Sequence, residues 1–195
     1  MNSISINKHN VGRIAERIVS NELESRGFRV SDLNKEGTSA NADLLAAKDG
    51  KTWQIQVKGA TYDNDYDNGW YVNYGFCDDA IIDGQKEMFN VANSFYKAEI
   101  VVLVCVRELR VYRCVVFPLK VAREAAALNL NYAYRPLNSD GSRKKPNRVS
   151  VSLGYIHKPR DASQLPLREK EQELLTQFED NWDFEDTATP SSTDA

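Results

Sequence analysis

Histidine, cysteine and long apolar runs are scarce in this chain, and each scarcity excludes a class of function. The only two histidines, His9 and His157, are far apart, which argues against a histidine-based zinc site. The three cysteines are odd in number and lack metal-ligand spacing, so a reducing cytosol is the simplest setting. No run of about 18 apolar residues exists, so we expect no membrane span. The opening MNSISINKHN lacks the apolar region of a signal peptide, and we therefore expect a cytoplasmic protein.

The charge is unevenly distributed. The net charge is −3, but residues 169–195 contain nine acidic residues and one basic residue, so the other 168 residues carry +5. A mildly basic body with an acidic tail is compatible with a polyanionic partner, and equally with an ordinary solvated surface. At 195 residues and 42% hydrophobic content, the chain is long enough for one sizeable core. We expect one domain over 1–183 and an acidic disordered tail over 184–195.

The order of expected elements indicates the fold class. They are a helix over 9–27, a strand over 28–33, a hairpin over 42–59, a strand over 69–76, a helix over 83–96, a central strand over 99–107 with its hairpin partner over 110–117, a helix from 118 to 128, a strand over 149–156 and a helix near 167–182. Helices and strands alternate, which predicts an α/β fold: a three-layer α/β/α sandwich around a central mixed sheet.

The segment ADLLAAKDGKTWQIQVKG, residues 42–59, contains the most informative pattern. Asp49-Gly50 predicts a two-residue hairpin loop of type I′, because both positions of that turn need positive φ. If these two residues form the loop, Asp43 lies directly opposite Gln56. Alternation then places Gln54, Gln56 and Lys58 on one face of the second strand, and Trp53, Ile55 and Val57 on the other.

This polar face has the composition of a site for a hard cation. Asp43 offers carboxylate oxygens and Gln56 a carbonyl oxygen, which are ligand types that Mg²⁺ prefers and Mn²⁺ accepts. Lys58 could polarise a water or stabilise charge that develops on a phosphate. No Ser-His or Cys-His pair and no glycine-rich phosphate loop competes with this interpretation. The combination favours phosphodiester hydrolysis over acyl transfer.

With its upstream helix GRIAERIVSNELESRGF, the AD…QxK pattern resembles the PD-(D/E)xK nuclease superfamily, in particular small members related to archaeal Holliday-junction resolvases and Mrr-type or type II restriction endonucleases. The resemblance covers residues 10–60. It implies a restriction-endonuclease-like fold and a magnesium-dependent endonuclease acting on DNA. It assigns catalysis to Glu16, Asp43, Gln56 and Lys58, with the first three as metal ligands. Cutting both strands of a duplex would indicate a homodimer, since each chain holds one site.

Two positions depart from the pattern of this superfamily. Ala42 replaces the usual proline of the superfamily, and Gln56 replaces the more frequent glutamate, which removes one negative charge from the site. An inactive module that binds nucleic acid and keeps the fold is therefore an alternative function. We also expect Gly12 to permit close approach of the first helix to its neighbours.

Each candidate residue also has an ordinary structural role open to it. Asp43 could satisfy backbone donors at the start of a strand, Gln56 could occupy a solvent-facing position, and Lys58 could protect an edge strand from aggregation. Glu16 could be one more surface glutamate of a helix. For DNA contacts, the candidates are Lys35, Arg143, Lys144, Lys145 and Arg148, which could equally be solvated loop charges.

Overall fold

The computed structural model describes residues 8–33, 42–61, 70–74, 77–83, 86–91, 98–107, 110–133, 149–153 and 165–184. The helices are α1 (Lys8–Ser25), α3 (Leu119–Ala133) and α4 (Leu165–Gln177). The strands are β1 (Arg29–Asp32), β2 (Leu44–Lys48), β3 (Lys51–Thr61), β4 (Trp70–Tyr74), β5 (Cys77–Asp83), β6 (Lys86–Val91), β7 (Ile100–Arg107), β8 (Arg110–Pro118) and β9 (Val149–Leu153). No helix in these described ranges is long and apolar enough to cross a membrane.

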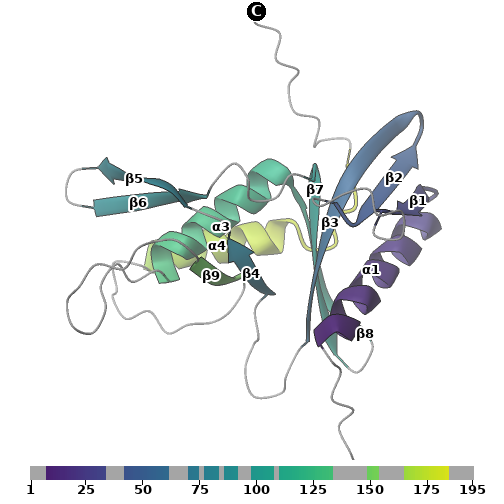
Figure 1. Ribbon diagram of the computed structural model, residues 1–195, viewed down its shortest axis with the longest axis horizontal. Helices are drawn as coiled ribbons and strands as arrows, with labels where there is room; N and C mark the ends of the chain where they lie inside the picture. The colour runs from purple at the N-terminus through teal and green to yellow at the C-terminus, as the bar shows by residue number, and fades with distance from the viewer. Residues whose placement is uncertain are drawn as a thin grey trace, which may run out of the picture.

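A five-stranded mixed sheet is the centre of the molecule, with the order β1-β2-β3-β7-β8. β3 and β7 run parallel, and the other neighbouring strands run antiparallel. Helix α1 covers one face of the sheet, while α3 and α4 lie on the other side (Figure 1). The predicted α/β architecture, a mixed sheet flanked by helices, is confirmed.

The β2–β3 hairpin has the predicted register. Leu44 pairs with Ile55 and Lys48 with Lys51, so the loop consists of Asp49 and Gly50. Both loop residues have positive φ, 50° and 78°, as a type I′ turn requires. The turn chemistry alone was therefore sufficient to align the two strands.

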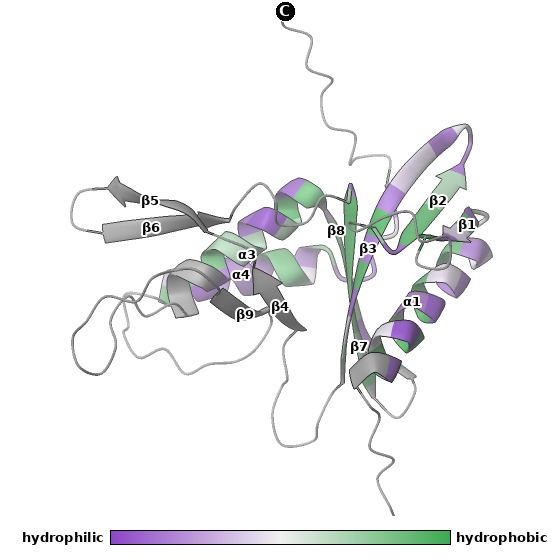
Figure 2. Cartoon of the chain, viewed as in Figure 1, coloured by the Kyte–Doolittle hydropathy of each residue, from purple (hydrophilic) through white to green (hydrophobic). Residues whose placement is uncertain are grey.

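Apolar side chains alternate along the sheet between two cores. On the α1 side, Ala15, Val19 and Leu23 of the helix pack in one buried cluster with Ile55 and Val57 of β3. The opposite face is buried beneath α3 and α4, and its buried residues are Val101, Leu103, Val115, Phe117, Ala122, Ala125, Ala126 and Leu175. Figure 2 shows the hydrophobic colouring along the central strands, whereas α1 carries much hydrophilic colouring. Strand β7 is covered on both faces, which explains its continuous apolar run.

The chain after α4 passes around the edge strand β8. The Val116 amide donates to the Phe178 carbonyl at 2.9 Å, and the Asp180 amide donates to the Cys114 carbonyl at 3.0 Å. Trp182 and Phe184 then join the core on the α1 side. Since these bonds satisfy backbone groups that an edge strand leaves unpaired, residues 178–184 protect this edge of the sheet.

Two expectations for the C-terminal part need correction. The last helix was expected to continue to residue 182 but ends at Gln177, because the backbone of the next residues pairs with β8 instead. Phe184, which we assigned to the tail, is only 3% exposed and packs against Phe28. The remaining tail, 185–195, lies outside the described residues.

The helix expected over 83–96 is wrong. Residues 77–83 and 86–91 form the antiparallel strands β5 and β6, in which Asp83 pairs with Lys86. Because Asp83 pairs with Lys86, only the sequence Gly84-Gln85 separates the two strands, and glycine first in a two-residue loop is typical of a β-hairpin. This turn preference outweighed the helical spacing of the apolar residues. The final strand, β9, pairs with β4 in a separate two-stranded sheet.

The close contact between α1 and the sheet depends on Gly59, not on Gly12 as we expected. A Cβ on Gly59 would lie 2.9 Å from both the Ala15 Cβ and the Val11 carbonyl oxygen, while a Cβ on Gly12 would meet nothing within 4 Å. The glycine needed for close packing therefore belongs to the strand.

We expect Gly59→Ala to lower the free energy of unfolding by about 1–3 kcal/mol, because the added methyl group forces α1 away from β3. Gly12→Ala is the matched control, and should raise it by about 0.5–1 kcal/mol by removing a flexible residue from a helix interior. Urea unfolding followed by circular dichroism measures both. Equal effects of the two substitutions would contradict the assignment of the contact to Gly59.

Cys105 of β7 and Cys114 of β8 are buried, and neither forms a disulfide with a described residue. Burial, reinforced by the carboxylates of Asp180, Glu22 and Glu179, raises the pKa of Cys114 from 9.0 to about 12. Above pH 9 the unfolded chain loses a proton that the folded chain retains, so the thiol favours unfolding progressively up to about pH 12.

Wild type should therefore lose stability relative to Cys114→Ala as the pH rises through this window, by at most about 1.4 kcal/mol per pH unit. Unfolding curves of both proteins, collected on either side of pH 9.0, measure the difference. A difference that does not change with pH would show that the thiol ionises equally in both states.

Candidate functional site at the open end of the β2–β3 hairpin

Asp43 lies directly beside Gln56, as the register predicted. The Asp43 amide donates to the Ile55 carbonyl at 2.8 Å, and the Val57 amide donates to Asp43 Oδ2 at 2.7 Å. These two bonds enclose Gln56 on the neighbouring strand. Strand β2 begins only at Leu44, so the Asp43 carboxylate continues the hydrogen-bonding of β3 beyond the end of its partner strand.

One oxygen of Asp43 therefore has the structural role that was left open from the sequence. Its carboxylate is turned toward the backbone of β3, and does not simply project from the polar face as we expected. The two roles are compatible, because a carboxylate has two oxygens and Oδ1 can still serve as a ligand. The bond to Val57 also orients the group.

Gln56 contains an unusual atom. Its side chain is half-buried, yet Oε1 is inaccessible to solvent and accepts no hydrogen bond from any described residue. A buried carbonyl oxygen without a donor is costly, and in native proteins it often marks a missing ion or water. Lys58 follows two residues later on the same strand, so it projects to the same face, and it is also half-buried.

Glu99 is a polar-face residue that we did not identify from the sequence. It directly precedes β7, and its Oε2 accepts a hydrogen bond from the Gln54 amide at 2.9 Å. A carboxylate thus completes the hydrogen-bonding of β3 on the β7 side, as Asp43 does on the β2 side. The sequence signal, an acid just before an apolar strand, becomes meaningful only once β7 is known to be the parallel neighbour of β3.

Glu16 comes from a different layer. It follows Ala15, the residue that approaches Gly59, so its backbone lies close to the part of β3 just after Lys58. Its side chain is half-buried. However, α1 packs on the face formed by Ile55 and Val57, which is opposite to the face of Gln56 and Lys58. The role of Glu16 stays a prediction.

The predicted DNA contacts cannot be located. Lys35, Arg143, Lys144, Lys145 and Arg148 all lie outside the described residues. Within the part of the chain that is described, no group of three or more His, Cys, Asp or Glu residues is arranged to hold a metal ion. A cation at the polar face would therefore depend on a mixed set of ligands, with the Gln56 amide oxygen among them.

Comparison with known proteins assigns no family to this chain. No family profile matches the sequence, and no curated protein is significantly similar to it. The solved structures with a similar chain path include that of a bacterial homing endonuclease, I-Ssp6803I. It is 13% identical over 86% of this chain and 92% of that chain, with a TM-score of 0.37. At this level of similarity, the candidate site must be judged by its own contacts.

The bond between Asp43 and the Val57 amide can be tested by stability. Asp43→Ala should lower the free energy of unfolding by about 1–3 kcal/mol, because it leaves a partly buried amide without an acceptor. Asp43→Asn should cost clearly less, since its side-chain oxygen can still accept the bond. Chemical denaturation measures both. If alanine and asparagine were equally tolerated, the bond would contribute nothing to the fold.

Proposed function

We propose that this protein is a metal-dependent endonuclease that hydrolyses phosphodiester bonds in DNA, with its active centre at Asp43, Gln56 and Lys58. The observation that carries the proposal is the buried Gln56 Oε1, which has no hydrogen-bond donor among the described residues and belongs to the residue beside the oriented carboxylate of Asp43. A donor-free oxygen next to a carboxylate suits a cation better than it suits a neutral core.

The residues fit a hard divalent ion such as Mg²⁺ or Mn²⁺. Gln56 Oε1 and Asp43 Oδ1 would be ligands from two adjacent strands, and Glu16 is the further ligand that the nuclease resemblance implies. When bound, the ion would supply Lewis-acid stabilisation of the charge on a phosphate group. Asp43 would be held in position for this task by its bond to the Val57 amide.

Lys58 would act on the substrate directly. Its ammonium group projects to the same face as Gln56, where it would donate to a phosphate oxygen and stabilise the charge of the transition state. The predicted phosphate contacts, Lys35, Arg143, Lys144, Lys145 and Arg148, would add sequence-independent affinity for DNA. Cleavage of both strands would require two copies of the chain, which favours a homodimer.

A second candidate function is an inactive nucleic-acid-binding module. Gln56 is the observation in its favour, because an amide at the position of the usual glutamate lowers the negative charge available to a metal ion. Such a module would bind DNA but would not cut it. The two proposals therefore differ in one measurable property.

Cleavage of supercoiled plasmid with added Mg²⁺ or Mn²⁺ distinguishes them. We expect wild type to nick or linearise the plasmid, and Asp43→Asn to reduce the rate by about 100-fold or more, because an oriented metal ligand is worth several kcal/mol in the transition state. Asparagine is chosen because it can keep the bond to Val57. Lys58→Met should cause a loss of similar size through removal of the cation.

Gln54→Ala is the matched control for Gln56→Ala. Both residues belong to the same face of β3, but Gln54 is exposed and its contact with Glu99 uses only the backbone. We expect Gln56→Ala to lose cleavage and Gln54→Ala to keep it. DNA binding without cleavage by wild type would support the inactive module, and cleavage unaffected by Asp43→Asn and Lys58→Met would overturn the proposed centre.

A further inference from the structure

A cavity of about 490 Å³ lies at the tip of the β2–β3 hairpin, away from the polar face. Its walls come from the end of α1, the β2–β3 turn and the segment after α4, and they include Phe28, Lys48, Lys51, Trp53, Trp182 and Phe184. Lys51 and Trp53 alternate with Gln54 and Gln56 along β3, so the cavity opens on the α1 side of the sheet. Its volume is within the range of about 300–1,000 Å³ that is typical of small-molecule sites.

Aromatic rings form the inner wall of this cavity. Trp53 meets Phe28 and Phe184 edge to face, with ring centroids 5.7 and 5.6 Å apart. Phe28, Trp182 and Phe184 are all less than 10% exposed, whereas Trp53 is only half-buried. Trp53 is therefore the ring that the cavity offers to a ligand.

Two lysines line the cavity. Lys48 and Lys51 are paired directly across the hairpin, an arrangement in which like charges repel. Lys48 is partly compensated, since its Nζ donates to the Arg26 carbonyl at 3.0 Å and lies 5.0 Å from the centre of the Phe28 ring. Lys51 is exposed, and its ammonium group makes no hydrogen bond or ion pair with any described residue. Among the described residues, no carboxylate forms an ion pair with either lysine.

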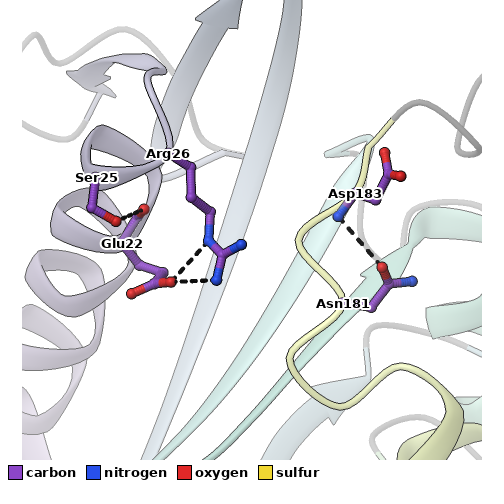
Figure 3. A network of polar contacts seen from close by, with 5 residues as sticks. All are labelled: Glu22, Ser25, Arg26, Asn181 and Asp183. Carbon is purple, nitrogen blue, oxygen red and sulfur yellow. Dashed lines mark hydrogen bonds and ion pairs between the residues drawn. The ribbon is translucent and has the colours of Figure 1, made fainter.

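Arg26 is part of the wall, and its charge is already paired with a carboxylate. Its guanidinium forms an ion pair with Glu22 at 2.6 Å and a hydrogen bond with the same carboxylate at 2.8 Å, as drawn in Figure 3. It also lies 5.7 Å from the centre of the Trp182 ring. Asp49 and Asp183 also line the cavity, and their negative charge opposes an anion. The attraction for an anion therefore comes from the two lysines.

We propose that this cavity binds a nucleotide, with its base stacked on Trp53 and its phosphate held between the ammonium groups of Lys48 and Lys51. A purely apolar ligand would leave the lysine pair uncompensated, and a phosphate alone would leave the indole face unused. A phosphate joined to a flat ring satisfies both. The ligand could be a free nucleoside monophosphate or the unpaired end of a strand, which share this chemistry. The inference does not depend on nuclease activity.

Tryptophan fluorescence of the full chain, measured with EDTA present, tests the proposal, because two of the three tryptophans line the cavity. Adenosine monophosphate should quench this fluorescence saturably, and calorimetry should give the same affinity. Adenosine and inorganic phosphate should each bind with an affinity at least about tenfold lower than that of adenosine monophosphate, since each lacks one of the two contacts. A short single strand with a 5′-phosphate that binds more tightly than the monophosphate identifies a strand end as the ligand, and weaker binding identifies the free nucleotide. If neither adenosine monophosphate nor the 5′-phosphorylated strand bound saturably, the proposal would be overturned.

Lys51→Met removes the uncompensated charge from an exposed position, so it should leave folding intact and weaken binding of the monophosphate by about tenfold. The matched control is Lys120→Met, which changes an exposed lysine of α3 on the other side of the sheet and should have no effect. Trp53→Phe, read by calorimetry, should also weaken binding. Unchanged affinity in Lys51→Met would exclude the lysine pair as the phosphate site.

Asp43→Asn separates this proposal from the nuclease. Asp43 belongs to the polar face, so its substitution should not change the affinity for the monophosphate, whatever it does to cleavage. A loss of binding in this variant would place the nucleotide at the polar face, and would contradict a site at the hairpin tip.

Discussion

The left-handed turn at Asp49-Gly50 is the constraint on which the described architecture depends. It aligns β2 with β3 so that Ile55 and Val57 face α1, and Gln56 and Lys58 face the other side. A shift of one residue would turn the amide and ammonium groups into the α1 core and expose the apolar side chains. Because β3 is the middle strand of the sheet, the position of β7 and the contact with α1 follow from this alignment.

β3 is longer than the strands that pair with it, and carboxylates complete its hydrogen bonding. Asp43 accepts the Val57 amide where β2 has not yet begun, and Glu99 accepts the Gln54 amide just before the start of β7. Both acids are thereby held close to the polar face. A structural role and a catalytic role of Asp43 are thus linked, since the bond that supports the strand also orients the group that would bind a cation.

The two faces of one hairpin have different chemistry. On one face, Gln56 and Lys58 lie beside an oriented carboxylate, while on the other Trp53 and Lys51 border an aromatic cavity. The second face is completed by residues more than a hundred positions away, because the chain after α4 crosses the edge of β8 and inserts Trp182 and Phe184 beneath the end of α1. The C-terminal segment therefore closes the sheet edge and forms one wall of the cavity.

Local chemistry determined much of this protein. The Asp-Gly dipeptide specified the hairpin register, alternation specified its faces, and the apolar run 100–106 specified a strand buried on both sides. Local signals failed where two of them competed, as in the segment 83–96, and where distant segments meet. Only the tertiary structure decided that Gly59 accommodates α1, that Glu99 joins the polar face and that residues 178–184 pair with β8. These features depend on contacts between residues far apart in the chain, whose geometry no spacing within a single segment contains.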